Sequence, residues 1–509
     1  MNFCKKTNEL KVAGILLWLA LPLSLGAQWN IAPVFSDYMV LQRGQPISVW
    51  GKGVPGEEVA VAFSGKTART EVSPDSSWLV VLPPHGVAHA GQPLTISARG
   101  FQAAFREVLV GDVWLCFGQS NMQWPMQREM HYPQEAQELN QPLLRFLNPT
   151  YAGEQVFGVP FTDSIVRKMT PASFYQGKWE RCDTASFRTM SAVGYYFGKA
   201  VASETQIPIG LIDLSIGGAP IEAFIPLPAL ANHPAYSAKT GSNWLQNPAL
   251  PVWVRERGAQ NTAGVSGLPQ DVHGPNHPFK PGFAYASGIE PLLRFPIKGL
   301  LWYQGESNAQ ESERVAEYPA LCGLMVSELR RLWKNPALPF YFVQLSSIDT
   351  LRYKGQLWPQ FREAQRTLPL LIPHSGMAVC SDAGAPHDVH PTDKKVVGER
   401  LARWALAETY AKRIIPSGPL PRKAKYQKGK IILDFYYGNG LHPSEGLLLK
   451  GFSLDGKKDI FAFIHKKNKV AIPCSAKPDF LYYGWKPFSD GNLVNREKLP
   501  ASTFKIKVQ

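Results

Sequence analysis

Polar and reactive side chains follow four short apolar runs of this sequence, each at the point where a run ends. They lie in GQSNM at 118–122, IGGAP at 216–220, QGESN at 304–308, and Asp382 with HDVHP at 387–391. Together these segments supply a hydroxyl, backbone amides, side-chain amides, imidazoles and carboxylates. That set is what acyl transfer needs: a serine attacks, an imidazole takes its proton, and N–H groups stabilise the oxyanion.

Each segment alone has a simpler explanation. Ser120 stands where a helix could begin, so it could be only a cap, and Gly217–Gly218 could be only a tight turn. Glu306 also suits the general acid of a glycosidase, but no second carboxylate is its evident partner and the serine would then have no role. The acyl-transfer interpretation is favoured because all four segments lie at one end of the sheet predicted next.

The elements that position these residues form an α/β pattern, because apolar runs of four to six residues alternate with segments of helical period. Such alternation predicts a parallel sheet with helices on both faces. The expected strands are 113–117, 209–214, 299–303, 340–345 and 377–381, and the expected helices are 190–204, 314–333, 358–368 and 392–410. In an open parallel sheet the ligand site lies beyond the carboxyl ends of the strands.

Shorter, turn-rich β patterns flank this part of the chain. Alternating runs separated by Gly and Pro predict a β-sandwich module at 28–105, and strand-like alternation resumes in a C-terminal β module at 416–509. The catalytic domain between them spans 106–415. Its segment 219–296 is rich in Pro, Asn, His and Gly with little periodicity, so we expect long loops there that form part of a substrate cleft.

The first 27 residues combine a basic start, an apolar run of about 14 residues and small residues at the end, which is typical of a secretory signal peptide. We therefore expect a secreted or periplasmic protein. No run is long enough to span a bilayer. The net charge of +14 comes without a nucleic-acid-binding motif, so we expect no nucleic-acid partner. No HExxH, GxGxxG or CxxC motif occurs, and we expect neither a metal nor a cofactor.

Four segments in this order resemble the sialate O-acetylesterase family of the SGNH hydrolase superfamily. They are GQSNM at 118–122, IGGAPIEAF at 216–224, WYQGESNA at 302–309 and DVHPTDKKVVGERLA at 388–402. The resemblance extends to APVFSDYMVLQRGQPISVWG at 32–51 and NLVNREKLPASTF at 492–504. It implies a three-layer α/β/α SGNH-hydrolase domain with a flavodoxin-like parallel sheet, flanked by β-sandwich-like modules at both ends.

The same resemblance implies the roles of the site residues. Ser120 is the expected nucleophile and His390 the expected general base. The expected oxyanion donors are the N–H of Ser120, a glycine amide at Gly217 or Gly218, and a side-chain amide, with Gln304 preferred to Asn308.

The acid of the triad is open. Superfamily members commonly have an aspartate three residues before the histidine, but His387 occupies that place here. Asp388, Asp382 or a backbone carbonyl is left to orient the imidazole, and we take Asp388 as the first choice.

The implied substrate is an O-acetylated sugar, and the expected reaction removes acetyl groups from sialic acids at the 9-hydroxyl. We expect Gln119, Trp124 and Glu306 to contact it, with Trp244 and Trp253 as further aromatic candidates. A sialic acid carboxylate would need a cation such as Arg128, Arg255 or Arg257. An acetylesterase acting on xylan or xyloglucan is the alternative, and a non-catalytic carbohydrate-binding protein is the alternative of another class. The oligomeric state has no signal in the sequence.

Overall fold

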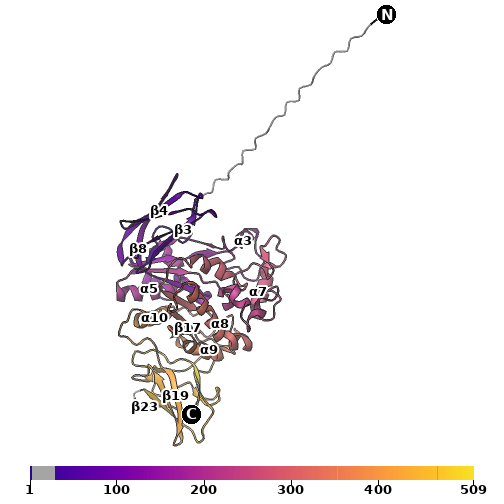
Figure 1. Ribbon diagram of the computed structural model, residues 1–509. Coiled ribbons are helices and arrows are strands. Elements are labelled where there is room, and N and C mark those ends of the chain that lie inside the picture. Colours follow the sequence, from indigo (N-terminus) through magenta and orange to yellow (C-terminus); the bar gives the residue numbers. More distant parts are fainter. Residues whose placement is uncertain (3–28, 352, 467) are drawn as a thin grey trace.

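The computed structural model describes residues 1–2, 29–351, 353–466 and 468–509 (Figure 1). The predicted signal peptide at 1–27 lies outside the described residues, apart from its first two positions. Among the residues that are described, no helix combines the length and the apolar content that crossing a membrane requires.

A mixed sheet with five central parallel strands forms the centre of the fold. Its order is β13 (Ile209–Asp213), β8 (Phe101–Gly118), β16 (Gly299–Tyr303), β17 (Phe340–Gln344) and β18 (Ser375–Val379). All five pair in parallel. Beyond β13 the sheet continues with parallel β9 (Leu144–Leu147) and antiparallel β12 (Trp179–Arg181). The predicted strands therefore form, and they are almost wholly buried because helices cover both faces of the sheet.

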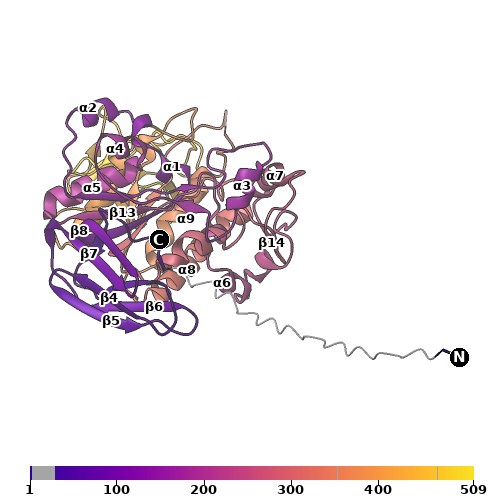
Figure 2. The same cartoon turned by 90° about the horizontal axis from the view of Figure 1, so that it is seen from above.

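Four long helices cover this sheet. On one face α5 (Ala192–Thr205) packs on α10 (Lys395–Trp404), and on the other α8 (Ser312–Leu332) packs on α9 (Trp358–Leu371). Figure 2 shows α5 on one side of the sheet and α8 on the other. These are the four predicted helices, although α10 begins three residues later than expected and passes into the π-helix η7 (Ala405–Thr409). Short helices complete the layers: α1 (Ser120–Gln123), η1 (Met126–Arg128), α2 (Tyr132–Gln137), α3 (Asp163–Lys168) and α4 (Thr184–Thr189).

The N-terminal strands are continuous with the central sheet. Strand β8 is 18 residues long, and its first half pairs with β7 (Ala88–Ala98) while its last residues pair with β13 and β16. The predicted boundary at 105 falls inside this strand, and one hydrophobic core extends from Val34 to Leu406. The remaining strands here are β1 (Asn30–Ile31), β2 (Val40–Gln42), β3 (Ile47–Lys52), β4 (Glu58–Phe63), β5 (Lys66–Glu71) and β6 (Ser77–Leu82).

The C-terminal strands, orange to yellow in Figure 1, have a hydrophobic core of their own between Ala424 and Val508. Arg362 on α9 connects them to the rest of the chain by donating to the backbone carbonyls of Gly484 and Lys486. The strands are β19 (Leu420–Gln427), β20 (Lys430–Tyr436), β21 (His442–Pro443), β22 (Phe452–Ser453), β23 (Phe463–Lys466), β24 (Lys469–Pro473), β25 (Phe480–Tyr483), β26 (Leu493–Val494) and β27 (Phe504–Lys507).

The segment 219–296, expected as long loops, instead contains several helices, most of them short. The longest is α7 (Val252–Thr262), whose sequence VWVRERGAQNT has no clear apolar period, so the pattern gave no signal for it. The others are η2 (Ile221–Phe224), α6 (Leu227–Ala231), η3 (Ser237–Thr240), η4 (Tyr285–Ile289) and η5 (Glu290–Leu292). This segment lies beside the carboxyl end of the sheet, where α3 and α7 are neighbours (Figure 1).

Candidate active site

Ser120 and His390 meet at the carboxyl end of the sheet. Ser120 begins α1, directly after β8, and His390 lies in the loop before α10. His390 Nε2 is 2.8 Å from Ser120 Oγ, a hydrogen bond between groups 270 positions apart in sequence. Gly118 lets the end of β8 lie close to β16, because it has φ +131° and a Cβ there would lie 2.2 Å from the Tyr303 carbonyl oxygen. The arrangement suits proton transfer from the hydroxyl to the imidazole.

Trp124 packs flat against the His390 imidazole. The ring centroids are 5.3 Å apart with an interplanar angle of 19°, so the indole fixes the plane of the base. Trp253 is half-buried and packs beside Gly218. Trp244 is 1% exposed and donates from Nε1 to the Pro275 carbonyl, so this side chain belongs to the core and cannot stack on a sugar.

Asp388 and Asp382 are the two carboxylates that the sequence leaves as candidates for the acid of the triad, and only Asp388 contacts His390. Asp388 Oδ1 accepts the His390 backbone N–H at 2.8 Å and lies 3.4 Å from His390 Nδ1, with 64% of its side chain exposed. Asp382 instead pairs in a bidentate manner with Arg400, at 2.6 and 2.7 Å. His387 pairs with Asp349 at 2.7 Å. The structure thus leaves Asp388 as the carboxylate that can orient the imidazole.

A buried polar network lies beneath the pair. Asn121 donates to Glu306 Oε1 and, at 2.9 Å, to the Val389 carbonyl, while its Oδ1 accepts from Lys394 Nζ. The network connects the start of α1, which carries Ser120, to the loop that carries His390. Glu306, which we expected at the substrate, is 2% exposed and is a member of this network instead.

Burial controls the protonation of these groups. It lowers the pKa of Lys394 to about 7 and raises the pKa of Glu306. Burial and then the Lys394 ammonium lower the pKa of His390, and Asp388 opposes this shift only in part. A lowered pKa keeps the imidazole neutral, as a general base must be.

Two backbone amides are available for an oxyanion. The Gly217 N–H is already used, because it donates to the Tyr151 hydroxyl at 3.0 Å. Within the described part of the chain, the N–H groups of Gly218 and Ser120 have no hydrogen-bond acceptor. Gly218 has φ +78°, a left-handed conformation that glycine adopts without strain.

The side-chain amides brace the turns around the site. Gln304 Nε2 uses both protons, donating to Asn308 Oδ1 at 2.7 Å and the Ala219 carbonyl at 3.3 Å. Asn308 Nδ2 donates one proton to Glu222 at 3.1 Å, so of these two amides only Asn308 keeps a proton to spare. Gln119 Oε1 accepts from the Gly305 and Ser307 amides, at 3.3 and 3.4 Å, and so joins the first segment to the third.

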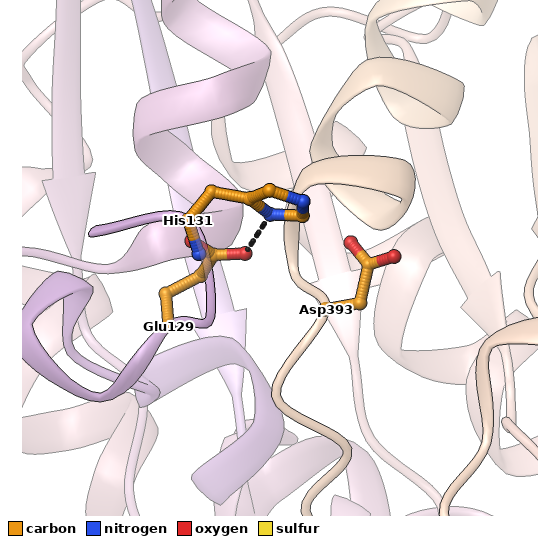
Figure 3. Close-up of side chains that lie close together, drawn as sticks. All are labelled: Glu129, His131 and Asp393. Carbon is orange, nitrogen blue, oxygen red and sulfur yellow. Dashed lines mark hydrogen bonds and ion pairs between the residues drawn. The ribbon is translucent and has the colours of Figure 1, made fainter. Parts of the chain in front are cut away.

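Glu129, His131 and Asp393 form a cluster of side chains of the types that can bind a metal ion (Figure 3). One donor atom from each lies within 4.8 Å of the others. Glu129 is fully engaged without an ion: it accepts from His131 Nδ1 at 2.9 Å, from the His131 backbone at 2.6 Å and from the Tyr196 hydroxyl at 2.9 Å. With the bond from Met130 N to the Thr392 carbonyl, the cluster holds the segment after α1 against the loop after His390.

Sequence reasoning missed three of the residues that build this site. Asn121 and Lys394 stand inside the recognised segments, beside Ser120 and after His390, so their positions were visible but their contacts were not. Tyr151 gave no signal, because it lies on the two-residue strand β10 (Thr150–Tyr151), far from any recognised segment.

Comparisons with known proteins find carbohydrate esterases. A family model described as carbohydrate esterase, sialic acid-specific acetylesterase matches residues 285–407. The chain is 28% identical to the sialate O-acetylesterase of Homo sapiens over 470 residues, covering 83% of this chain and 80% of that protein. It is 27% identical to the sialate O-acetylesterase of Mus musculus over 446 residues, covering 81% and 80%. The crystal structure of a carbohydrate acetylesterase from Xanthomonas citri is 30% identical with a TM-score of 0.76, covering 94% of this chain and 99% of that one.

Proposed function

The chain belongs to the sialate O-acetylesterase family of carbohydrate esterases, and from that premise we propose that it removes O-acetyl groups from sialic acids through a serine acyl-enzyme. Family membership makes it a carboxylic ester hydrolase that acts on acetylated sugars. The acyl-enzyme, the sialic acid and its 9-O-acetyl group are the parts that we propose. The hydrogen bond between His390 Nε2 and Ser120 Oγ is the observation that carries the mechanism.

In this mechanism His390 takes the proton of Ser120 as Oγ attacks the acetyl carbonyl carbon. The tetrahedral oxyanion accepts hydrogen bonds from the N–H groups of Ser120 and Gly218, with the spare proton of Asn308 as the candidate third donor. His390 then protonates the leaving sugar oxygen, which departs as a hydroxyl group. Water, deprotonated by His390, attacks the acyl-enzyme, and His390 returns the proton to Ser120 Oγ as acetate leaves. Losing one oxyanion donor typically lowers turnover by about 10² to 10³.

The strand order supports an SGNH-hydrolase architecture for the catalytic part. In chain order the five central strands β8, β13, β16, β17 and β18 lie as 2-1-3-4-5, which is flavodoxin-like. The order reverses between β8 and β16, and Ser120 and the QGESN segment follow these two strands. We propose that the N-terminal and C-terminal strands brace this domain as β modules.

An acetylesterase of plant polysaccharides, such as xylan or xyloglucan, is the second candidate. The relative from Xanthomonas citri is a carbohydrate acetylesterase, a class that includes enzymes acting on either substrate.

The test is acetate release by the wild type and by Ser120→Ala, from 9-O-acetylated sialic acid and from acetylated xylan in parallel. We expect serine-dependent release from the sialic acid, with unchanged folding of the variant. Release from xylan alone would transfer the same mechanism to the second candidate. Full turnover by Ser120→Ala would refute the acyl-enzyme, and release from neither substrate would leave a carbohydrate-binding protein.

A further inference from the structure

Arg257 is a half-buried cation that contacts two aromatic rings. It projects from α7, and its guanidinium carbon lies 5.4 Å from the centroid of the Phe157 ring and 5.2 Å from that of Trp253. Rings at these distances hold the plane of a guanidinium and leave its N–H edges for other partners.

The two rings place this guanidinium beside the turn at 216–219, called the oxyanion turn here because we assign its Gly218 N–H to the oxyanion. A Cβ built on Gly218 would lie 3.0 Å from the Trp253 ring, and one on Gly217 would lie 3.9 Å from the Phe157 ring. One aromatic side chain therefore separates Arg257 from the turn that presents the Gly218 N–H. Arg257 and Gly217 also line one small cavity together with Tyr151 and Phe157.

Arg257 has no anionic partner in the described part of the chain. Its Nε is buried without a hydrogen-bond acceptor, and burial, with no carboxylate nearby, lowers its pKa. The Nε of Arg362 is also buried without an acceptor, but its terminal N–H groups donate to the Ser347 hydroxyl and the Gly484 carbonyl, each at 3.1 Å. Arg257 makes no such hydrogen bond in the described part of the chain, so its whole guanidinium lacks an acceptor. A buried donor of a charged group without an acceptor is destabilising, so such a group in a site calls for an anion.

The other two candidate arginines lack these features. Arg255 donates from Nε to the Leu250 carbonyl at 3.3 Å. Arg128 is exposed and lies over Trp124, so water hydrates its charge.

We infer that Arg257 binds a carboxylate of the acetylated sugar, so that the enzyme selects acidic over neutral acetylated sugars. This inference rests on the proposed function. A guanidinium matches a carboxylate with two parallel N–H···O bonds, and such an anion would supply the acceptors that Arg257 lacks. Two classes of acetylated sugar carry this group: sialic acids, and xylan fragments with a uronic acid branch.

The experiment compares kcat/KM within two substrate pairs. One pair is 9-O-acetylated sialic acid and its methyl ester, and the other is an acetylated xylan fragment with and without a glucuronic acid branch. The variants are Arg257→Gln, Arg257→Lys and the matched control Arg255→Gln, which removes the same charge from the same helix. Hydrolysis of 4-nitrophenyl acetate reports on the catalytic residues alone.

We expect the wild type and Arg255→Gln to prefer the acidic member of one pair by roughly 10- to 100-fold, as a charge-assisted hydrogen bond gives. Arg257→Gln should abolish that preference through KM and keep its rate on 4-nitrophenyl acetate. Arg257→Lys should retain part of the preference, and it decides the question if Arg257→Gln does not fold. The pair that shows the preference identifies the source of the carboxylate.

Equal rates of the wild type on both members of both pairs would overturn the role of Arg257 while leaving the esterase intact. Retained preference in Arg257→Gln would overturn it as well. A wild type that hydrolyses 4-nitrophenyl acetate but no acetylated sugar would instead refute the proposed function, and this inference with it.

Discussion

Replacing Tyr151 by phenylalanine removes one hydroxyl group. The variant tests whether the hydrogen bond from the Gly217 N–H to this hydroxyl keeps the oxyanion turn in place. The Tyr151 hydroxyl accepts the Gly217 N–H at 3.0 Å and faces Gln123 Oε1 at 3.4 Å. Burial raises the pKa of Tyr151, so the hydroxyl stays neutral at any working pH. The variant leaves the Gly217 N–H buried without an acceptor, next to the residue whose N–H we assign to the oxyanion.

The size of the effect follows from that orphaned donor. A buried N–H without an acceptor costs about 1 to 3 kcal/mol. The free energy of unfolding should fall by no more than this amount. If the turn relieves the loss by rotating Gly218 away from the oxyanion, the same free energy appears in the transition state. It then corresponds to a loss of about 5- to 150-fold in kcat.

Tyr175→Phe is the matched control, because Tyr175 is the cross-strand partner of Tyr151. Its hydroxyl donates to the Leu214 carbonyl at 2.9 Å and does not touch the glycine turn. The assay measures kcat and KM on an acetyl ester, together with denaturant unfolding, for both variants. We expect both to lose stability but only Tyr151→Phe to lose kcat, with KM nearly unchanged. Equal kcat in the two variants would refute the assignment of this turn to the oxyanion.

Two further predictions concern the base. Because burial and Lys394 lower the pKa of His390, activity should be lost only as the pH falls through a value below the ordinary 6.5, so the acid limb of kcat/KM should lie there. Lys394→Met removes a positive charge that opposes the imidazolium and should move that limb to higher pH. Lys395→Met, at the half-exposed neighbour that lies 3.9 Å from Glu135, should not. A limb unmoved by Lys394→Met would contradict this field effect. Asp388→Asn should lower kcat by only about tenfold, since solvent screens an exposed carboxylate 3.4 Å from Nδ1, and a loss near the 10⁴ of a buried triad aspartate would show that it acts as one.

The five central strands and the four long helices were predictable because their patterns are local. Continuous apolar runs mark strands buried on both faces, and a period near 3.6 marks helices that cover them. Helix α7 was missed because its sequence has no clear apolar period. The boundary expected at 105 was placed inside β8, since alternation changes to a continuous apolar run there while the strand itself continues.

The sequence by itself determined which four segments converge, because parallel strands bring their carboxyl ends to one edge and Ser120 and His390 follow two such strands. Only the tertiary structure decided the partners of each side chain. It separated Asp388 from Asp382, which Arg400 holds, and it buried Glu306 and Trp244. It also left Arg257 without an anion beside the glycine turn. The physical reason is that the formation of strands and helices depends on local pattern, whereas burial and hydrogen-bond partners depend on which distant segments pack together.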